Sequence, residues 1–272
     1  MSVVRVRAPA TTANVGPGYD CVAVALDLWN ELEVSDGDGV ADLDHLGISA
    51  FARLAPLEGR SFTFVDRIPR ERGLGSSASV IALGLVAAAA LAGLDLSPEE
   101  LLAEGLPLEG HPDNLAAALA GGVCLTWDAR IARVAEDTPA VPIALVPDAT
   151  VSTAAARAAL PENVPHADAA FTAGRAALLG VALASGSAEL FANALADRLH
   201  EPYRADGAPL LAAVREQPPA GALGSTVSGS GPTVVVWAAR ESADACAAEL
   251  GERFPDISVQ TLSVSPRGAH LL

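Results

Sequence analysis

The chain has 272 residues, 51% of them hydrophobic and 18% charged, so a large core is expected and wholesale disorder is excluded. Acidic residues outnumber basic ones 33 to 17, and the formal net charge of −16 argues against nucleic acid or an anionic membrane as a main partner. All 17 basic residues are arginine. Chemistry that needs a lysine, such as a P-loop lysine or a Schiff base, is therefore excluded.

The cysteines and the apolar segments indicate the compartment. Cys21, Cys124 and Cys246 lie far apart without a CxxC pair, which predicts reduced core thiols rather than a disulfide scaffold or a zinc site. The N-terminus lacks the long apolar segment of a secretory signal, and the most apolar run, residues 80–93, is too short to span a bilayer. We therefore expect a soluble, cytoplasmic protein.

The first half of the chain predicts strands mixed with helices. Apolar or alternating runs indicate strands at residues 3–7, 21–34, 61–65, 123–127 and 141–147. A Gly/Asp-rich turn is expected at residues 36–44. Helices are expected from Ser76 to Gly93, from Ser97 as N-cap with Pro98 at the first helical position, and at residues 114–119. Gly105 and Pro107 are expected to end the second helix early.

The second half has a different, Ala-rich texture. Helices are expected at residues 167–184, 188–199 and 242–254, a strand–glycine turn–strand unit at 223–238 and a last strand at 259–264. The change of texture at Pro147 predicts two domains, residues 1–147 and 148–272. Strand runs separated by helix runs indicate the α+β class rather than a regular βαβ repeat.

The strongest motif is Gly73-Leu74-Gly75-Ser76-Ser77-Ala78, where a loop becomes a helix. Two glycines let the backbone curl around an anion, and the first N–H groups of the helix point at it. The motif also fits the G-x-G-x-x-A dinucleotide fingerprint, but Pro69 interrupts the strand that this fingerprint requires. A glycine helix start with serine caps and no ligand is the plain structural alternative.

Two further segments concentrate polar side chains. Residues 9–20 (PATTANVGPGYD) place Asn14 and Asp20 in a stiff turn, as active-site loops often do, although an ordinary polar loop would look similar. Residues 109–114 (EGHPDN) carry two carboxylates, a histidine and an amide. Such oxygen ligands suit Mg²⁺ better than zinc. A fourth segment, residues 228–232 (SGSGP), is weak alone because many hairpins have such turns.

These four segments, in this order along the chain, resemble the GHMP small-molecule kinases and, within them, the homoserine kinase family. Two weaker positions also match, namely Thr153 and Arg157 before Leu160-Pro161, and the segment LHEPYR that ends at Arg204. The stretch before Gly73 does not align residue by residue, so the adenine pocket stays undefined.

The resemblance implies a fold, a reaction and a set of site residues. The fold would be an N-terminal part like ribosomal protein S5 domain 2 and a ferredoxin-like C-terminal part. The reaction would transfer a phosphoryl group from ATP, with Mg²⁺, to the side-chain hydroxyl of L-homoserine, a step toward threonine. Homodimers are common in the family, so a homodimer is expected.

The site residues that the resemblance implies fall into four groups. The catalytic group is Asn14, Asp113 and Asn114. The substrate group is Asp20 and His111 for the amine end, Thr153, and Arg157 and Arg204 for the carboxylate. The ATP group is Pro69, Arg70, Glu71, Arg72, Gly73, Leu74, Gly75, Ser76, Ser77, Ala78 and Ser79. The Mg²⁺ group is Ser77 and Glu109. Whether Asp113 removes a proton is left open, since phosphoryl transfer depends mainly on positioning.

Two alternatives remain at this point. One is another GHMP kinase, acting on threonine, mevalonate or a methylerythritol derivative; mevalonate-type sites use a lysine near the first motif, and this chain has none. The other is a catalytically inactive GHMP-like binding protein. Erosion of GLGSS or EGHPDN would mark such a protein, and both motifs are intact.

Overall fold

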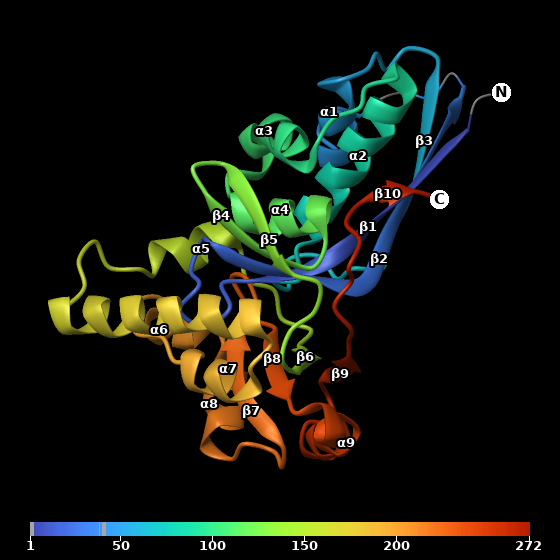
Figure 1. The fold of residues 1–272 in the computed structure, drawn as a ribbon. Coiled ribbons are helices and arrows are strands. Elements are labelled where there is room, and N and C mark those ends of the chain that lie inside the picture. Colours follow the sequence, from blue (N-terminus) through green and yellow to red (C-terminus); the bar gives the residue numbers. More distant parts are fainter. Residues whose placement is uncertain (1–2, 38, 40–41) are drawn as a thin grey trace.

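Two antiparallel sheets form the frame of the molecule (Figure 1). The structure, a computed structural model, describes residues 3–37, 39 and 42–272. The first sheet has the order β10-β1-β2-β4-β5, with β3 also paired to β2. Its strands are β1 (Val4–Ala13), β2 (Val22–Asp36), β3 (Arg60–Val65), β4 (Val123–Trp127), β5 (Arg130–Ala135) and β10 (His270–Leu271). The second sheet has the order β7-β8-β6-β9, formed by β6 (Val141–Val146), β7 (Ala222–Val227), β8 (Val234–Ala238) and β9 (Ser258–Thr261).

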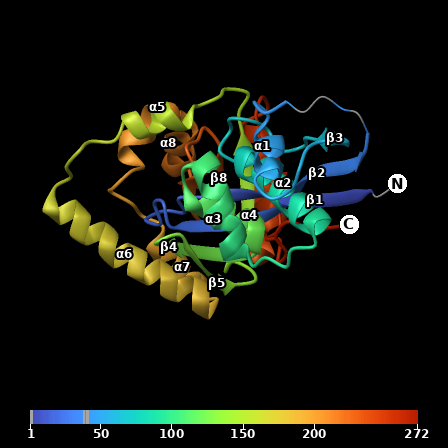
Figure 2. The ribbon, with the colours of Figure 1, turned by 90° about the horizontal axis from the view of Figure 1, so that it is seen from above.

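Helices cover these sheets in layers. Four helices lie over the first sheet (Figure 2): α1 (Leu46–Ala52), α2 (Ser76–Ala92), α3 (Pro98–Glu109) and α4 (Pro112–Ala120). A second core joins the two sheets to α6 (His166–Ser185) and α7 (Ala188–Ala194). A third packs the second sheet on α8 (Pro209–Glu216) and α9 (Ala243–Arg253). Short segments complete the chain, namely α5 (Thr153–Ala158) and the 3₁₀ turns η1 (Pro202–Gly207) and η2 (Arg240–Ser242). The predicted α+β class is confirmed.

Local signals predict several boundaries well. Helix α2 begins at Ser76 and stops at Gly93, which has the left-handed conformation of a helix C-cap. The Ser97 hydroxyl accepts from the backbone N–H of Glu100, and the Glu100 carboxylate accepts from the backbone N–H of Ser97. Helix α3 therefore starts with a complete capping box. These signals act over a few residues, and no distant contact is needed to interpret them.

The expected early end of α3 is wrong, because the helix continues through Pro107 to Glu109. Gly105 faces the side chain of Leu115, and a Cβ atom there would lie 2.6 Å from it. Tight packing of α3 on α4 thus holds the helix together. Pro107 removes one backbone N–H donor inside the helix, and the packing on α4 offsets this cost.

Helix α7 ends at Ala194, five residues before the expected boundary at residue 199. The Asp197 carboxylate accepts hydrogen bonds from the backbone N–H groups of Leu199, His200 and Glu201. These bonds favour a turn over another helical turn. The sequence patterns also do not predict α1, β5, α8 or β10. The expected strand at residues 259–264 is shorter, and the expected turn at 36–44 includes residues 38, 40 and 41, which lie outside the described residues.

The C-terminal segment returns from the second sheet to the first and packs on the end of α4. Strand β10 pairs with β1, and the N–H of Ala269 donates to the carbonyl of Ala118 at 2.7 Å. The division of the chain into domains at residue 147 stays a prediction.

Among the described residues, one helix, α6, is long and apolar enough to cross a membrane by length and composition. This helix packs along α7.

A prediction follows from this return. A Cβ atom at Gly268 would lie 2.0 Å from the backbone oxygen of Leu119. We expect Gly268→Ala to lower the free energy of unfolding by about 1–3 kcal/mol, since backbone must move to admit the methyl group. Urea unfolding measures this. The control is Gly174→Ala in the middle of α6, where a Cβ atom meets open space; it should raise stability by about 0.5–1 kcal/mol. Equal midpoints for Gly268→Ala and the parent would contradict the packing argument.

Candidate active site

A cavity of about 470 Å³ opens where loops of both sheets meet. It collects residues from the end of β1, the N-termini of α1, α2, α4 and α5, the end of α3, the η1 turn and the turn between β7 and β8. The predicted site residues that line it are Asn14, Asp20, Arg70, Glu71, Gly73, Gly75, Ser76, Ser77, Glu109, His111, Asp113, Asn114, Thr153, Arg157 and Arg204. Segments up to about 200 residues apart in sequence thus share one cavity.

Five residues of the predicted ATP group do not line this cavity: Pro69, Arg72, Leu74, Ala78 and Ser79. Leu74, Ala78 and Ser79 are buried, and the Ser79 hydroxyl donates to the carbonyl of Ala8. Three of the five therefore support the turn from behind.

Arg72 connects the glycine turn to another part of the chain. Its guanidinium donates to the carbonyl oxygens of Pro147 at 2.8 Å and Asp148 at 2.9 Å. The N–H of Val151 donates to the carbonyl of Glu71 at 3.1 Å. Together these bonds fasten the turn that opens α2 to the segment that leads into α5.

The N-terminus of α2 has the properties of an anion site. Gly75, the N-cap residue, has φ +65° and makes no side-chain cap to the first helical N–H groups. A Cβ atom there would lie 1.9 Å from the hydroxyl oxygen of Thr11. The uncapped N–H groups and the helix dipole favour a negatively charged group at this end of the cavity.

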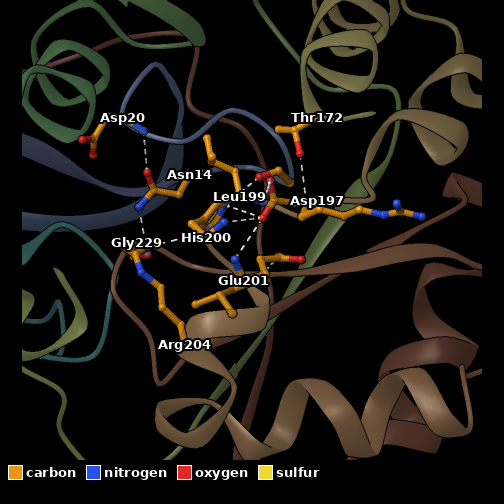
Figure 3. A network of polar contacts seen from close by, with 12 residues as sticks. Asn14, Asp20, Thr172, Asp197, Leu199, His200, Glu201, Arg204 and Gly229 are labelled. Atoms are coloured by element: carbon orange, nitrogen blue, oxygen red, sulfur yellow. Dashed lines mark hydrogen bonds and ion pairs between the residues drawn. The ribbon is translucent and has the colours of Figure 1, made fainter. Parts of the chain in front are cut away.

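Asn14 occupies the end of β1 in a left-handed conformation, with φ +59°. Its amide donates to the carbonyl of Gly229 at 2.9 Å, and its side-chain oxygen accepts from the N–H of Asp20 at 2.8 Å (Figure 3). The N–H of Gly229 in turn donates to the carbonyl of Ala13. The amide of Asn14 is therefore held by both sheets, and these contacts stabilise an unfavourable backbone conformation.

Two carboxylates lie at the junction of α3 and α4. Desolvation by burial raises the pKa of Glu109 to about 7, although the Ser77 hydroxyl, which donates to it at 2.9 Å, favours ionisation. Desolvation likewise raises the pKa of Asp113 to about 6. Burial also lowers the pKa of His111, the N-cap residue of α4, so this imidazole is neutral at pH 7. Negative charge here is costly until a cation approaches.

Arginines form the opposite wall. Arg157 donates to the Asp20 carboxylate at 2.6 Å and to the Tyr19 hydroxyl at 3.0 Å. Arg204 is only 4% exposed and donates to the carbonyl of Gly229. The Nε atoms of both arginines are buried and have no hydrogen-bond partner in the described part of the chain. Two guanidinium groups with unused donors suit a carboxylate ligand.

A buried network fixes the turn that carries Arg204 (Figure 3). Asp197 binds three successive N–H groups at the start of this turn. Glu201 accepts from Arg215 at 2.6 Å and from the N–H of Val227 at 3.1 Å. The His200 ring nitrogen Nε2 donates to the carbonyl of Gly16 at 2.7 Å. The position of Arg204 is thus set by carboxylates that never reach the cavity.

Some lining residues do not belong to the predicted site groups: Asp44, His45, Leu46, Val80, Val151, Ser152, Gly229 and Ser230. Gly229 and Ser230 belong to the SGSGP segment, whose glycines are a usable signal. The remainder carry no local pattern. His45, for example, caps α1 by accepting from the N–H of Gly47, and only the fold brings it to the cavity.

Comparisons with known proteins agree with this geometry. Family models match residues 44–122 (GHMP kinases N terminal domain) and residues 180–256 (GHMP kinases C terminal). The chain is 39% identical to the homoserine kinase of Streptomyces avermitilis, covering 100% of this chain and 96% of that protein. It is 38% identical to the homoserine kinase of Gloeobacter violaceus, covering 98% of each. The chain belongs to the homoserine kinase family of GHMP kinases.

Solved structures match the fold over the same length. The crystal structure of homoserine kinase from Cytophaga hutchinsonii superposes with a TM-score of 0.88 at 24% identity, covering 100% of this chain and 98% of that one. The Methanococcus jannaschii mevalonate kinase gives 0.71 at 13% identity, covering 97% and 98%. The frame is therefore common to GHMP kinases that differ widely in sequence.

Oxygen donors at one end of the cavity are of the kind that Mg²⁺ prefers. Ser77 and Glu109 offer a hydroxyl and a carboxylate beside the N-terminus of α2. Among the described residues there is no group of three or more His, Cys, Asp or Glu that could hold a metal ion. The Ser77 hydroxyl and the Glu109 carboxylate fit Mg²⁺, which is usually held by one or two carboxylates together with water and substrate phosphate oxygens.

The raised pKa of Asp113 predicts that ionisation of this buried carboxyl lowers the stability of the folded protein. Its pKa rises from 3.8 to about 6 on folding. Between these values the folded protein binds more protons than the unfolded chain, so this carboxyl lowers stability as the pH increases, by ~2–3 kcal/mol above pH 6. Asp113→Asn keeps an oxygen acceptor for the N–H of Asn114. We expect this variant to be more stable than the parent at pH 8, with a difference that shrinks toward pH 4.

Urea unfolding of the parent and of Asp113→Asn at pH 8, 5 and 4 measures this difference. A difference that is the same at all three pH values would show that the carboxyl is not destabilised by burial.

Proposed function

We propose that this protein transfers the γ-phosphoryl group of ATP to the side-chain hydroxyl of L-homoserine, giving ADP and O-phospho-L-homoserine, on the way to threonine. The homoserine kinase relatives, which align over the full chain, support this activity. The observation that carries it is the pairing, within one cavity, of a helix N-terminus without a side-chain cap and a buried arginine, Arg204, whose Nε has no hydrogen-bond partner among the residues that the structure describes. One end suits a polyphosphate, and the other suits an amino acid.

The phosphate end of the reaction relies on positioning and charge. We propose that the N–H groups that open α2 bind the phosphates, while Ser77 and Glu109 hold Mg²⁺. Mg²⁺ supplies Lewis-acid neutralisation of the phosphate charge when bound. Gly73, Gly75 and Ser76 then allow close approach of the backbone, and Arg70 and Glu71 form the rim. Fixed dipoles and a cation can replace the lysine that other phosphate sites use.

The acceptor end must hold a zwitterion. We propose that Arg157 and Arg204 bind the carboxylate, that Asp20 and His111 face the amine, and that Thr153 closes the pocket. Asn14, Asp113 and Asn114 then position the hydroxyl. Thr11 donates to the side-chain oxygen of Asn114 at 2.6 Å, which orients that amide. Asp113, with a pKa of about 6, is mostly ionised at pH 7.5 and can accept the hydroxyl hydrogen bond.

The cellular setting stays a prediction. We expect a cytoplasmic homodimer that binds neither nucleic acid nor membranes. The net charge of −16 supports the expectation about nucleic acid.

An ADP-release assay tests the proposed function. With ATP and Mg²⁺, we expect turnover on L-homoserine to exceed that on L-threonine, L-serine and mevalonate by at least about 100-fold in kcat/KM, because a site that pairs the polar groups of one substrate leaves them unpaired with another. Equal turnover on mevalonate would favour another GHMP kinase. ATP binding without turnover on any acceptor would favour an inactive binding protein.

Substitution of Arg204 tests whether this side chain binds the carboxylate of the acceptor. Because its guanidinium is buried, we expect Arg204→Ala to raise the homoserine KM by roughly 100-fold or more, with the ATP KM nearly unchanged. Steady-state kinetics measure both constants, and Arg5→Ala, which removes an exposed arginine of β1, is the control. A homoserine KM equal to that of the parent would make an alcohol without a carboxylate the better substrate candidate.

A further inference from the structure

Tyr19 contacts Arg157 and Arg204, two arginines that line the cavity, but does not line the cavity itself. The guanidinium carbon of Arg204 lies 4.9 Å from the centre of the Tyr19 ring, and that of Arg157 lies 5.7 Å from it. Arg157 also donates to the Tyr19 hydroxyl at 3.0 Å. One aromatic side chain therefore contacts two cations, through its ring and, for Arg157, also through its oxygen.

The ring rests on a rigid base. Tyr19 stacks on the His200 ring with centroids 5.1 Å apart and planes inclined by 28°. His200 is fully buried, and its ring is held by the carbonyl of Gly16 at 2.7 Å. The backbone N–H of His200 is bound by the Asp197 carboxylate (Figure 3). The base beneath Tyr19 is thus fixed from two sides.

The two arginines need such support. Burial lowers the pKa of Arg204 below its usual value, and the like charge of Arg157 lowers it further. Without a partner between them, like charges move apart. An aromatic face attracts a cation by about 0.5–2 kcal/mol, more where water is excluded. The Tyr19 ring can therefore hold both guanidinium groups close, while their Nε atoms, which no described residue binds, can donate to a ligand.

We infer that Tyr19 is a positioning residue that holds Arg157 and Arg204 as a preassembled pair for the carboxylate of the acceptor. This inference rests on the proposed function and deepens it. The ring supports both arginines, whereas the hydroxyl fixes Arg157 alone. The two parts of one side chain thus make separable contributions to amino-acid binding.

Removal of the Tyr19 hydroxyl isolates its contribution to holding Arg157. We expect Tyr19→Phe to raise the homoserine KM about 3- to 10-fold, because one hydrogen bond to a charged group is lost while the ring remains. The kcat and the ATP KM should stay within a factor of two of the parent values, on the order expected for a residue remote from the nucleotide. The matched control is Tyr203→Phe, which removes the chain's other tyrosine hydroxyl, one residue before Arg204.

Two further measurements separate positioning from a general structural role. In an Arg157→Ala background, Tyr19→Phe should have no additional effect on kcat/KM, since the hydroxyl then has no guanidinium to hold. With 3-aminopropan-1-ol, which has the hydroxyl and the amine but no carboxylate, Tyr19→Phe should match the parent. Tyr19→Leu, which also removes the ring, should raise the homoserine KM by about 3-fold or more beyond Tyr19→Phe.

Each outcome separates this inference from the proposed function. A parent protein that fails to phosphorylate homoserine overturns the proposed function, and the inference about its carboxylate falls with it. A parent that is active on homoserine, with an unchanged KM in Tyr19→Phe, overturns the inference alone. The inference is also overturned if Tyr19→Phe weakens homoserine turnover equally in the Arg157→Ala background, or if Tyr19→Phe raises the ATP KM in parallel. Either result would show that the hydroxyl acts on something other than Arg157.

Discussion

The cavity depends on the contact between two glycine turns, residues 73–75 and 228–231. A hydrogen bond between Ser228 and Gly73, which lie 155 residues apart in sequence, joins these turns. A Cβ atom at Gly73 would lie 2.1 Å from the carbonyl oxygen of Ser228, and the Ser228 hydroxyl donates to the carbonyl of Gly73 at 2.6 Å. Only glycine permits this approach, since Gly73 also has φ +79°. Because one turn opens α2 and the other joins β7 to β8, the contact brings the N-terminus of α2 against the turn whose Gly229 carbonyl accepts from Arg204.

Burial, rather than net charge, sets the electrostatics of the site. The whole protein carries −16, which would repel a nucleotide at long range. Inside the cavity, desolvation raises the pKa of Asp113 to about 6 and lowers the pKa of Arg204. Both groups are therefore destabilised as charges in the ligand-free protein. A cation near Asp113 and a carboxylate near Arg204 would relieve these costs, since interactions between charges are stronger where water is excluded.

The sequence predicts local features of the chain well, and the ends of α3 and α7 show where distant or side-chain contacts override the local pattern. The Ser97 capping box and the Gly93 stop involve residues within one or two turns, so α2 and the start of α3 follow from pattern alone. The end of α3 does not, because the contact of Gly105 with Leu115 outweighs the proline at 107. The end of α7 also differs from the predicted boundary, since the Asp197 carboxylate binds the backbone N–H groups of Leu199, His200 and Glu201.

By itself, the sequence determined the family, the α+β class and the segments that hold the candidate site, because the motifs at residues 9–20, 73–78, 109–114 and 228–232 are local strings of residues with restricted backbone and side-chain chemistry. Only the tertiary structure decided which side chains meet. It turned Arg72 away from the cavity toward the carbonyls of Pro147 and Asp148, and it set Tyr19 beneath Arg157 and Arg204. The physical reason is that these contacts join segments about 75 to 185 residues apart, whose closeness is set by sheet pairing and core packing and leaves no periodic trace in the sequence.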